Sequence, residues 1–246
     1  MNKFIASLQF ITILPIGKKN IYDPKGMIQF FPLVGIILGL MLAGLDLVFL
    51  KFWPAPIAAL LDVIFLIIIT GAFHLDGLGD SADGLLGHRP LKKVLLIMKD
   101  SRIGVMALVV ILSSLAIKWG GILSLEPGLN RSLFLIIIPS YARAGMLFGI
   151  KFLEYGRPEG GTGHDLFQEE LKPSSFWGLL LPMIISIPLG LRGLYLFALF
   201  MLFNAIILFF YKRRMNCITG DMLGAMCELL EALLFLFISI TIQSWN

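Results

Sequence analysis

The chain has 246 residues, of which 58% are hydrophobic and 15% are charged, and its mean hydropathy is +0.89. Soluble domains are about 45–50% apolar and about 25% charged, so this composition is not that of a soluble protein. It also excludes a disordered chain, which needs low hydrophobicity and high charge. A net charge of +4 would suit a nucleic-acid binder, but such a protein would not contain this much Leu, Ile and Phe. With only two cysteines, the chain is not a disulfide scaffold either.

The first 27 residues precede the first long apolar run. Their apolar side chains recur at 4, 5, 8, 10, 11, 13 and 14, which is a helical spacing. This stretch is too short to span a membrane and lacks a small-residue cleavage site. It therefore predicts that residues 1–27 form a cytoplasmic amphipathic segment at the membrane interface.

Seven apolar runs follow, and a spanning helix needs about 20 mainly apolar residues. They cover residues 28–50, 56–73, 103–118, 133–150, 176–191, 194–211 and 222–243. The runs 176–191 and 194–211 are interrupted by Pro and Gly and can alternatively form a re-entrant hairpin. The sequence thus predicts an all-α, polytopic helical bundle with about seven transmembrane helices, forming a single integral membrane domain over residues 1–246.

Lys and Arg in the connections predict the orientation of this bundle. Seven spans place residues 1–27, 74–102, 151–175 and 212–221 on one side of the membrane, and 15 of the 20 Lys and Arg residues lie there. Positive residues favour the cytoplasmic side, so we expect a multi-pass protein of the cytoplasmic membrane, bacterial or archaeal, with its polar loops facing the cytoplasm.

The most informative polar stretch is HLDGLGDSADGLLG, residues 74–87. Asp76, Asp80 and Asp83 are spaced at i, i+4 and i+7, which places them on one face of a helix. Like charges so close together need a cation between them, and hard oxygen ligands suit Mg²⁺ or Mn²⁺ with phosphate oxygens completing the shell of the ion. The alternative is a solvated acidic loop. His74 fits a general base or ligand, or equally a boundary histidine bonded to the backbone.

The next polar stretch, KDSRIG, lies at the entrance of the third span at residues 99–104. Lys99 and Arg102 are three residues apart, and with Ser101 they form a candidate phosphate-binding group. Asp100 is a candidate fourth ligand of the metal. The alternative is an ordinary positive flank of a membrane helix.

Arg143 lies inside the span 133–150, where a charged side chain is costly and is by default a functional candidate. We expect it to hold a substrate phosphate. The alternative is a structural ion pair with an intramembrane acid such as Asp62 or Asp46.

Two further polar clusters lie near the end of the chain. The glycine-rich loop 155–165 contains Arg157 and Glu159, which fits a mobile lid over a polar ligand or a plain connector. In 217–232, Thr219 or Asp221 can cap the last helix, while Glu228 lies inside an apolar helix and should face a cavity or a cation. These clusters converge on the cytoplasmic side. Acids for a metal and bases for phosphates together indicate phosphoryl or nucleotidyl transfer.

The chain resembles the cobalamin-5′-phosphate synthases, also called adenosylcobinamide-GDP ribazoletransferases. The resemblance rests on the stretches 74–87, IMKDSRIG (97–104), RPEG (157–160) and TGDMLGAMCELLEA (219–232), together with FITILP (10–15) and FPLVG (31–35). The family often has Ala at the position of Gly79, and Thr at those of Ser81 and Met222. The last difference removes a hydroxyl near Asp221.

The resemblance implies that adenosylcobinamide-GDP and α-ribazole, or its 5′-phosphate, are joined with Mg²⁺ to give adenosylcobalamin, or its 5′-phosphate, and GMP. This reaction assembles the nucleotide loop of cobalamin. The implied partners are the corrinoid nucleotide, α-ribazole and the lipid bilayer, with no nucleic acid; the oligomeric state stays open, a homo-oligomer included. In this scheme Asp76, Asp80, Asp83 and Asp100 hold Mg²⁺, and the basic residues hold phosphates. The base that accepts the proton is a carboxylate or His74.

Two alternatives remain. Residues 80–84 also resemble the opening of the DxxDG motif of CDP-alcohol phosphotransferases of phospholipid synthesis, but the Ala-Arg that continues it is replaced by Gly87-His88. A metal-ion transporter would explain the intramembrane charged residues. It would typically show paired halves, and the sequence has no such repeat.

Overall fold

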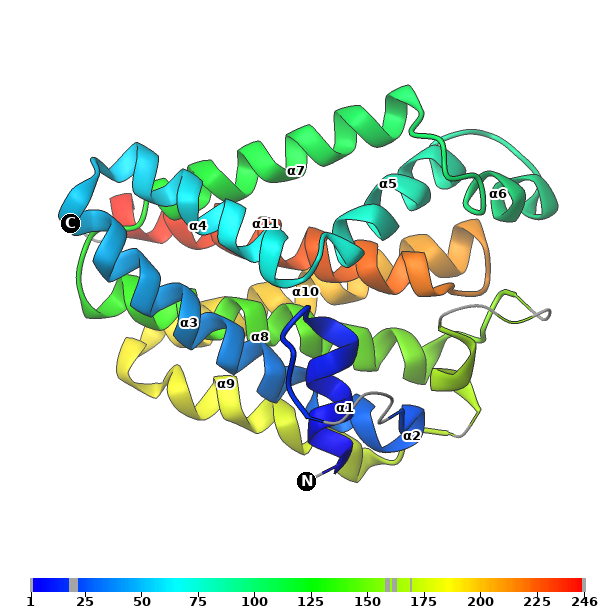
Figure 1. The fold of residues 1–246 in the computed structure, drawn as a ribbon, viewed down its shortest axis with the longest axis horizontal. Helices are drawn as coiled ribbons and strands as arrows, with labels where there is room; N and C mark the ends of the chain where they lie inside the picture. Colours follow the sequence, from blue (N-terminus) through cyan, green and yellow to red (C-terminus); the bar gives the residue numbers. More distant parts are fainter. Residues whose placement is uncertain (1, 18–21, 158–159, 161–162, 169, 245–246) are drawn as a thin grey trace.

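The computed structural model describes the chain except for residues 1, 18–21, 158–159, 161–162, 169 and 245–246, and describes side chains up to residue 240 (Figure 1). In chain order its helices are α1 (Asn2–Ile11), α2 (Pro24–Met27), η1 (Ile28–Phe30), α3 (Phe31–Phe52), α4 (Ala55–Ile69), α5 (Phe73–Leu85), α6 (Leu91–Ile97), α7 (Val105–Leu123), α8 (Leu129–Phe152), η2 (His164–Phe167), η3 (Pro173–Leu179), α9 (Leu180–Ile185), η4 (Ile187–Leu189), α10 (Leu191–Arg214) and α11 (Gly220–Ser244). The prediction of an all-helical membrane bundle is confirmed.

The number of spans differs from the seven expected. Within the described residues, five helices are long and apolar enough to cross a membrane, namely α3 with the preceding turn, α7, α8, α10 and α11. The expected span 56–73 reaches the required length only when α4 and α5 are taken together, across a bend of 89°. The expected span 176–191 is divided into η3, α9 and η4, because the prolines at 182 and 188 remove amide donors that a continuous helix needs. Five or six spans therefore replace seven.

The bend between α4 and α5 has a local cause. Gly71 and Ala72 have φ angles of +60° and +57°, a left-handed conformation that ends a right-handed helix. The Thr70 hydroxyl donates to the Leu66 carbonyl within the last turn of α4. The chain then restarts as α5 in a new direction. The bend therefore separates the apolar helix α4 from the aspartate-bearing helix α5.

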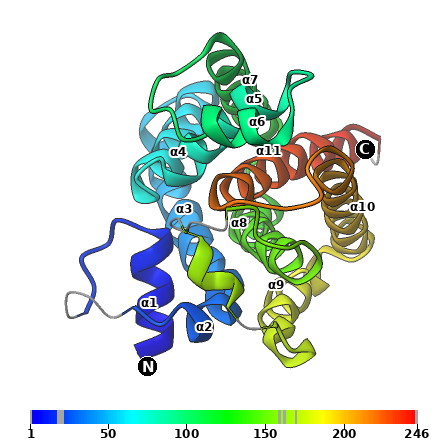
Figure 2. The same ribbon diagram turned by 90° about the vertical axis from the view of Figure 1, so that its right-hand side faces the viewer.

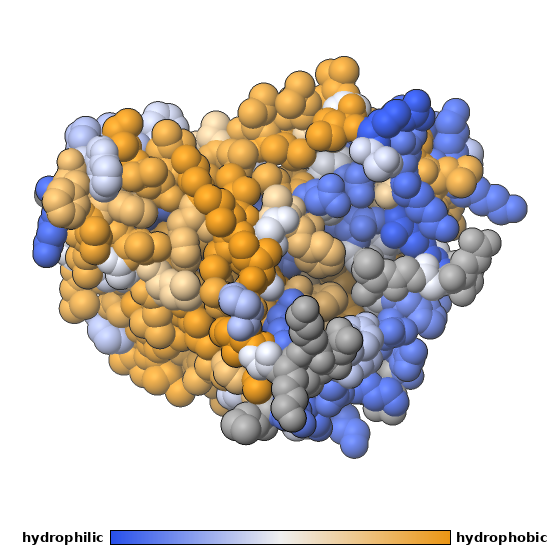
Figure 3. All heavy atoms as spheres, viewed as in Figure 1, coloured by the Kyte–Doolittle hydropathy of each residue, from blue (hydrophilic) through white to orange (hydrophobic). Residues whose placement is uncertain are grey.

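The centre of the bundle is formed by α8, with α11 and α3 beside it (Figure 2). A Cβ atom at Gly35 of α3 would lie 2.6 Å from the Pro139 carbonyl oxygen, so glycine there lets the two backbones touch. Ser140 also donates to the Pro32 carbonyl at 2.8 Å. By contrast, α7 and α10 lie at the periphery and expose apolar side chains such as Leu112 and Phe209. Figure 3 shows a broad apolar surface over the middle and the far side of this face of the bundle, which suits contact with lipid.

The two ends of the bundle differ in polarity. The α5–α6, α8–η2 and α10–α11 connections gather at one end, and most hydrophilic side chains lie there (Figures 1 and 3). We call this the basic end; by the positive-inside rule it faces the cytoplasm. The opposite, far end holds the α3–α4 and α7–α8 connections. Helix α1 packs near the start of α3, where the rings of Phe10 and Phe31 stack at 5.9 Å between centroids.

Candidate functional site

The candidate site forms where α5 meets the first turn of α11. A Cβ atom at Gly77 would lie 2.6 Å from the Asp221 carbonyl oxygen, and one at Gly224 would lie 3.2 Å from Cα of His74. Two glycines, one on each helix, therefore allow the helix backbones to approach closely. This packing places the aspartates of α5 beside the start of α11.

Three carboxylates and one guanidinium meet at this contact. Asp80 lies close enough to Asp76, Asp221 and Arg157 to interact with them electrostatically. Asp76 is exposed and Asp80 is half-buried, so a ligand can reach both carboxylates. We call Asp76, Asp80, Asp221 and Arg157 the carboxylate–arginine cluster. Three negative charges face one positive charge there, which leaves the cluster ready for a further cation.

Arg157 is tied to α11 but keeps free donors. Its Nη2 donates to Asp221 Oδ2 at 2.5 Å and to the Met98 carbonyl at 3.4 Å. Its Nε atom is buried and has no hydrogen-bond partner among the described residues. Thr219 accepts from the Met222 amide at 3.3 Å, so Thr219 caps α11 and the Asp221 side chain serves the ion pair instead. Arg157 thus holds Asp221 in place and brings one positive charge to the contact.

Asp83 differs from the other two aspartates of α5 in its hydrogen bonds. Its Oδ2 accepts from the Gly104 amide at 2.6 Å and its Oδ1 accepts from the Ala107 amide at 3.0 Å. These amides belong to the N-terminus of α7, where unpaired N–H groups and the helix dipole favour a carboxylate. Asp83 therefore joins α5 to α7, and its two oxygens face these amides.

In this structure Asp100 pairs with Arg102 rather than with the aspartates of α5. Its carboxylate accepts three hydrogen bonds from the Arg102 guanidinium and one from the Arg102 amide. The hydrogen bonds from Arg102 hold the pKa of Asp100 at about 2. The local turn brings residues two apart together, and it keeps Asp100 out of the carboxylate–arginine cluster. Lys99, Ser101 and Arg102 are exposed in the same connection between α6 and α7.

His74 is fully buried, and neither ring nitrogen has a hydrogen-bond partner among the described residues. It borders a small hollow lined mainly by apolar side chains such as Phe10, Phe73 and Leu223. The ring therefore has no contact with solvent in this structure. A role for His74 as a base would require the surrounding side chains to move.

Arg143 lies in a buried ion network in the middle of the bundle. It bonds to Glu231, which also accepts from Lys118 at 2.7 Å, and Lys118 donates to Glu228 at 2.7 Å. Lys118 and Glu231 are each 1% exposed, and Arg143 is 0% exposed. Two positive and two negative charges balance. A substrate contact by Arg143 or Glu228 would require this network to open.

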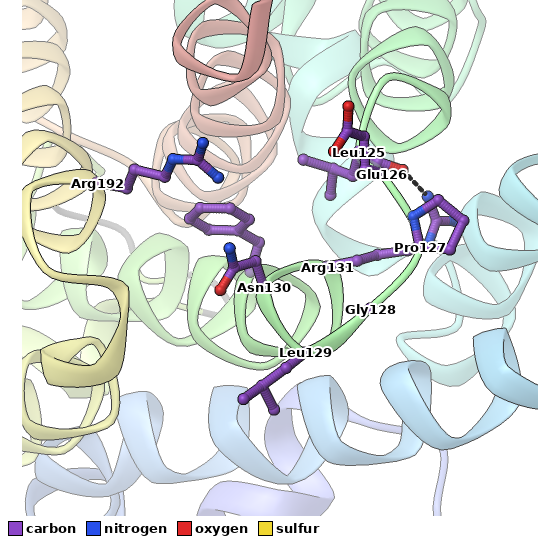
Figure 4. Close-up of a pocket in the computed structure, with 9 residues that line it drawn as sticks. Leu125, Glu126, Pro127, Gly128, Leu129, Asn130, Arg131 and Arg192 are labelled. Carbon is purple, nitrogen blue, oxygen red and sulfur yellow. Dashed lines mark hydrogen bonds between the residues drawn. The ribbon is translucent and has the colours of Figure 1, made fainter. Parts of the chain in front are cut away.

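Asp46 and Asp62 were the alternative ion-pair partners expected for Arg143. In the structure both lie beside Arg131 instead. Arg131 donates to both oxygens of Asp46, at 2.8 and 2.6 Å, and lies 3.6 Å from Asp62. The pairing of Arg143 with Asp46 or Asp62 is therefore wrong. Arg131 also donates to the Leu125 carbonyl beside a far-end cavity of about 230 Å³ (Figure 4).

The spans expected from the sequence place four basic residues in the connections of the far end, namely Lys51, Lys118, Arg131 and Arg192. The structure buries Lys118 and Arg131 in ion pairs, a role that the sequence reasoning missed, although a basic residue at the edge of an apolar run was a usable signal. Lys51 and Arg192 then remain at the far end, which strengthens the charge difference between the two ends. Glu159, the other residue expected in the loop 155–165, lies outside the described residues.

Comparisons with known proteins find one family and several relatives that match nearly the whole chain. The model of the family described as cobalamin-5-phosphate synthase matches residues 3–239. A relative from Alkaliphilus metalliredigens is 35% identical over 97% of this chain and 95% of its own length, and one from Brevibacillus brevis is 32% identical over 100% and 99%. One from Clostridium acetobutylicum is 29% identical over 92% and 91%. All three are named adenosylcobinamide-GDP ribazoletransferase. No solved structure matches the chain.

Proposed function

The chain belongs to the cobalamin-5-phosphate synthase family, and we propose that it joins adenosylcobinamide-GDP to α-ribazole, or to α-ribazole 5′-phosphate, with release of GMP. The corrinoid product is adenosylcobalamin or its 5′-phosphate. The observation that carries the proposal is the carboxylate–arginine cluster, which lies open at the basic end. It offers cation-binding oxygens and an anion-binding guanidinium side by side, as transfer between phosphate esters requires.

The reaction is a substitution at phosphorus. A ribose hydroxyl of α-ribazole attacks the phosphorus on the cobinamide side of the pyrophosphate. The bond between this phosphorus and the bridging oxygen breaks, and GMP leaves with that oxygen. Negative charge on the phosphate oxygens and the leaving group must be stabilised. Arg157 supports this role as the positive charge beside the carboxylates, while Lys99 and Arg102 are exposed and can meet incoming phosphates.

The donor set suits Mg²⁺ bound together with substrate. As placed, no three of the described His, Cys, Asp and Glu side chains form a ready-made metal site. Mg²⁺ commonly takes one or two carboxylates, with waters and substrate phosphates completing its octahedron. Asp76 and Asp80, one helical turn apart on α5, would hold the ion, with Asp221 nearby. When bound, the ion would neutralise charge on the phosphates and the leaving group.

The attacking hydroxyl must lose a proton, and a carboxylate of the cluster that does not hold the ion is a better candidate base than His74. Asp76 and Asp80 are at least partly exposed, whereas His74 is fully buried. A base must come within hydrogen-bond reach of the proton it accepts. Asp83 supports the site indirectly, because its hydrogen bonds to α7 fix the C-terminal turn of α5.

The test uses the purified protein in detergent, supplied with adenosylcobinamide-GDP, α-ribazole and a range of Mg²⁺ concentrations. Wild type should release GMP and form the corrinoid product without a sealed vesicle, which a transporter would not do. Asp80→Asn keeps the shape of the side chain and removes one charge. We expect GMP release to fall by about 100-fold or more, with the melting temperature little changed.

The matched control is Glu126→Gln, the same loss of charge on an exposed acid of the far-end connection. It should keep wild-type turnover. Normal turnover by Asp80→Asn at limiting Mg²⁺ would contradict the role of the cluster. A wild-type protein that forms neither product would contradict the proposed reaction.

A further inference from the structure

A second cavity, of about 410 Å³, opens at the basic end next to the carboxylate–arginine cluster. Ile150 and Leu153 from the end of α8 form its apolar base, and Tyr155, His164 and Phe167 contribute three rings. Glu154 stands at its wall. We infer that this cavity binds the guanine base of the corrinoid nucleotide, an inference that rests on the proposed function because that function supplies the GMP group.

The aromatic rings form a stacking surface. The Tyr155 ring lies 5.1 Å from that of Phe167 and 5.5 Å from that of His164, centroid to centroid. Flat nucleobases stack on such side chains, and each stack contributes affinity whatever the base. Ligand pockets commonly measure about 300–1,000 Å³, so this cavity has room for a nucleoside. The rings thus explain binding of a planar base but do not select one.

Glu154 supplies the selectivity. Guanine presents two adjacent donors, N1–H and the N2 amino group, and one carboxylate can accept both. The benzimidazole of α-ribazole has no N–H donor when linked to its ribose, and adenine presents an acceptor beside its amino group. The other carboxylate at the rim, Glu170, is already bound by Lys151. Glu154, which is exposed, is therefore the acid that distinguishes the base.

The backbone ties this cavity to the phosphate-binding part of the site. The Ile218 amide donates to the Glu154 carbonyl, and the Gly156 amide donates to the Ile218 carbonyl, both at 2.9 Å. This bridge holds the cavity wall against the chain three residues before Asp221. Arg157, two residues after Tyr155, reaches Asp221 itself. A nucleotide with its base in the cavity therefore directs its phosphates toward Arg157, since Glu154 would repel them.

The test measures the binding of GMP, IMP and AMP to the full-length protein in detergent by calorimetry. IMP lacks the N2 amino group, and AMP also replaces the N1–H donor by an acceptor. Wild type should bind GMP more tightly than IMP, and IMP more tightly than AMP. Glu154→Gln should weaken GMP binding by about tenfold or more and reduce its advantage over IMP, because bonds to a charged acceptor are lost.

Two variants complete the design. Glu170→Gln, at the same rim but with its carboxylate engaged by Lys151, should keep the wild-type order of affinities. Tyr155→Ala should weaken all three nucleotides, because stacking does not depend on the base. Melting temperatures confirm that each variant is folded.

The outcomes separate this inference from the proposed function. Equal affinity of wild type for GMP and AMP, or an unchanged GMP preference in a folded Glu154→Gln variant, would overturn the guanine assignment even if turnover is normal. Selective GMP binding that depends on Glu154, in a protein that forms no corrinoid product, would support the assignment and refute the reaction.

Discussion

Replacing Lys118 with methionine should strongly destabilise the bundle. The Lys118 ammonium is 1% exposed and donates to Glu228 and Glu231, both at 2.7 Å. Methionine has a similar length but no charge. Glu231 would remain paired with Arg143, while Glu228, which is 5% exposed, would lose the cation that binds it. The variant thus leaves one carboxylate buried without its counter-ion.

The size of the effect follows from burial. Removing one partner of a buried pair costs about 3–5 kcal/mol, because the remaining charge is uncompensated. For a chain of this length, about 1 kcal/mol corresponds to roughly 2–4 °C in melting temperature, so the expected decrease is about 6–20 °C. Adding Glu228→Gln neutralises that carboxylate while keeping its shape. The double variant Lys118→Met/Glu228→Gln should recover most of the loss.

The assay is thermal unfolding of the purified protein in detergent. The matched control is Lys151→Met, because Lys151 also pairs with a glutamate, but that partner, Glu170, is 87% exposed. Surface pairs contribute about 0–1 kcal/mol, so this variant should melt within about 4 °C of wild type. Equal decreases for Lys118→Met and Lys151→Met would refute the argument from burial. A double variant no more stable than Lys118→Met alone would refute the assignment of Glu228.

Two other predictions test the site and the topology. Gly77→Ala should slow GMP release by about tenfold or more, because its Cβ would lie 2.6 Å from the Asp221 carbonyl oxygen and force α5 away from α11. The control is Gly120→Ala, whose Cβ meets nothing within 4 Å and which should release GMP at the wild-type rate. Equal activities of the two variants would contradict the close helix contact. Cysteines replacing the exposed Lys92 of α6 and Leu129 of α8 should react with an impermeant thiol reagent from opposite membrane sides, Lys92→Cys from the cytoplasm. Labelling of both from one side would contradict the assignment of the two ends.

The amino-acid sequence was sufficient for the class of protein, for most of its helices and for the side on which the polar residues gather. Apolar runs long enough to span a membrane are a local property, and Lys and Arg in connections report orientation without tertiary contacts. The spacing of Asp76 and Asp80 likewise follows from helix geometry alone. The reaction was inferred from the sequence stretches that resemble the family, because the pattern of charges alone does not identify the substrates.

Tertiary structure decided which charges meet. Asp46 and Asp62 were the acids named as possible partners of Arg143, and only the packing of α8 against α11 paired it with Glu231, leaving Asp46 to Arg131. Asp83 was equivalent to Asp76 and Asp80 by spacing, until the approach of α7 gave it amides to accept from. Ion pairs and caps act over a few ångströms between segments far apart in the chain. Helical periodicity places a side chain on a face, but only the neighbouring helix determines its partner.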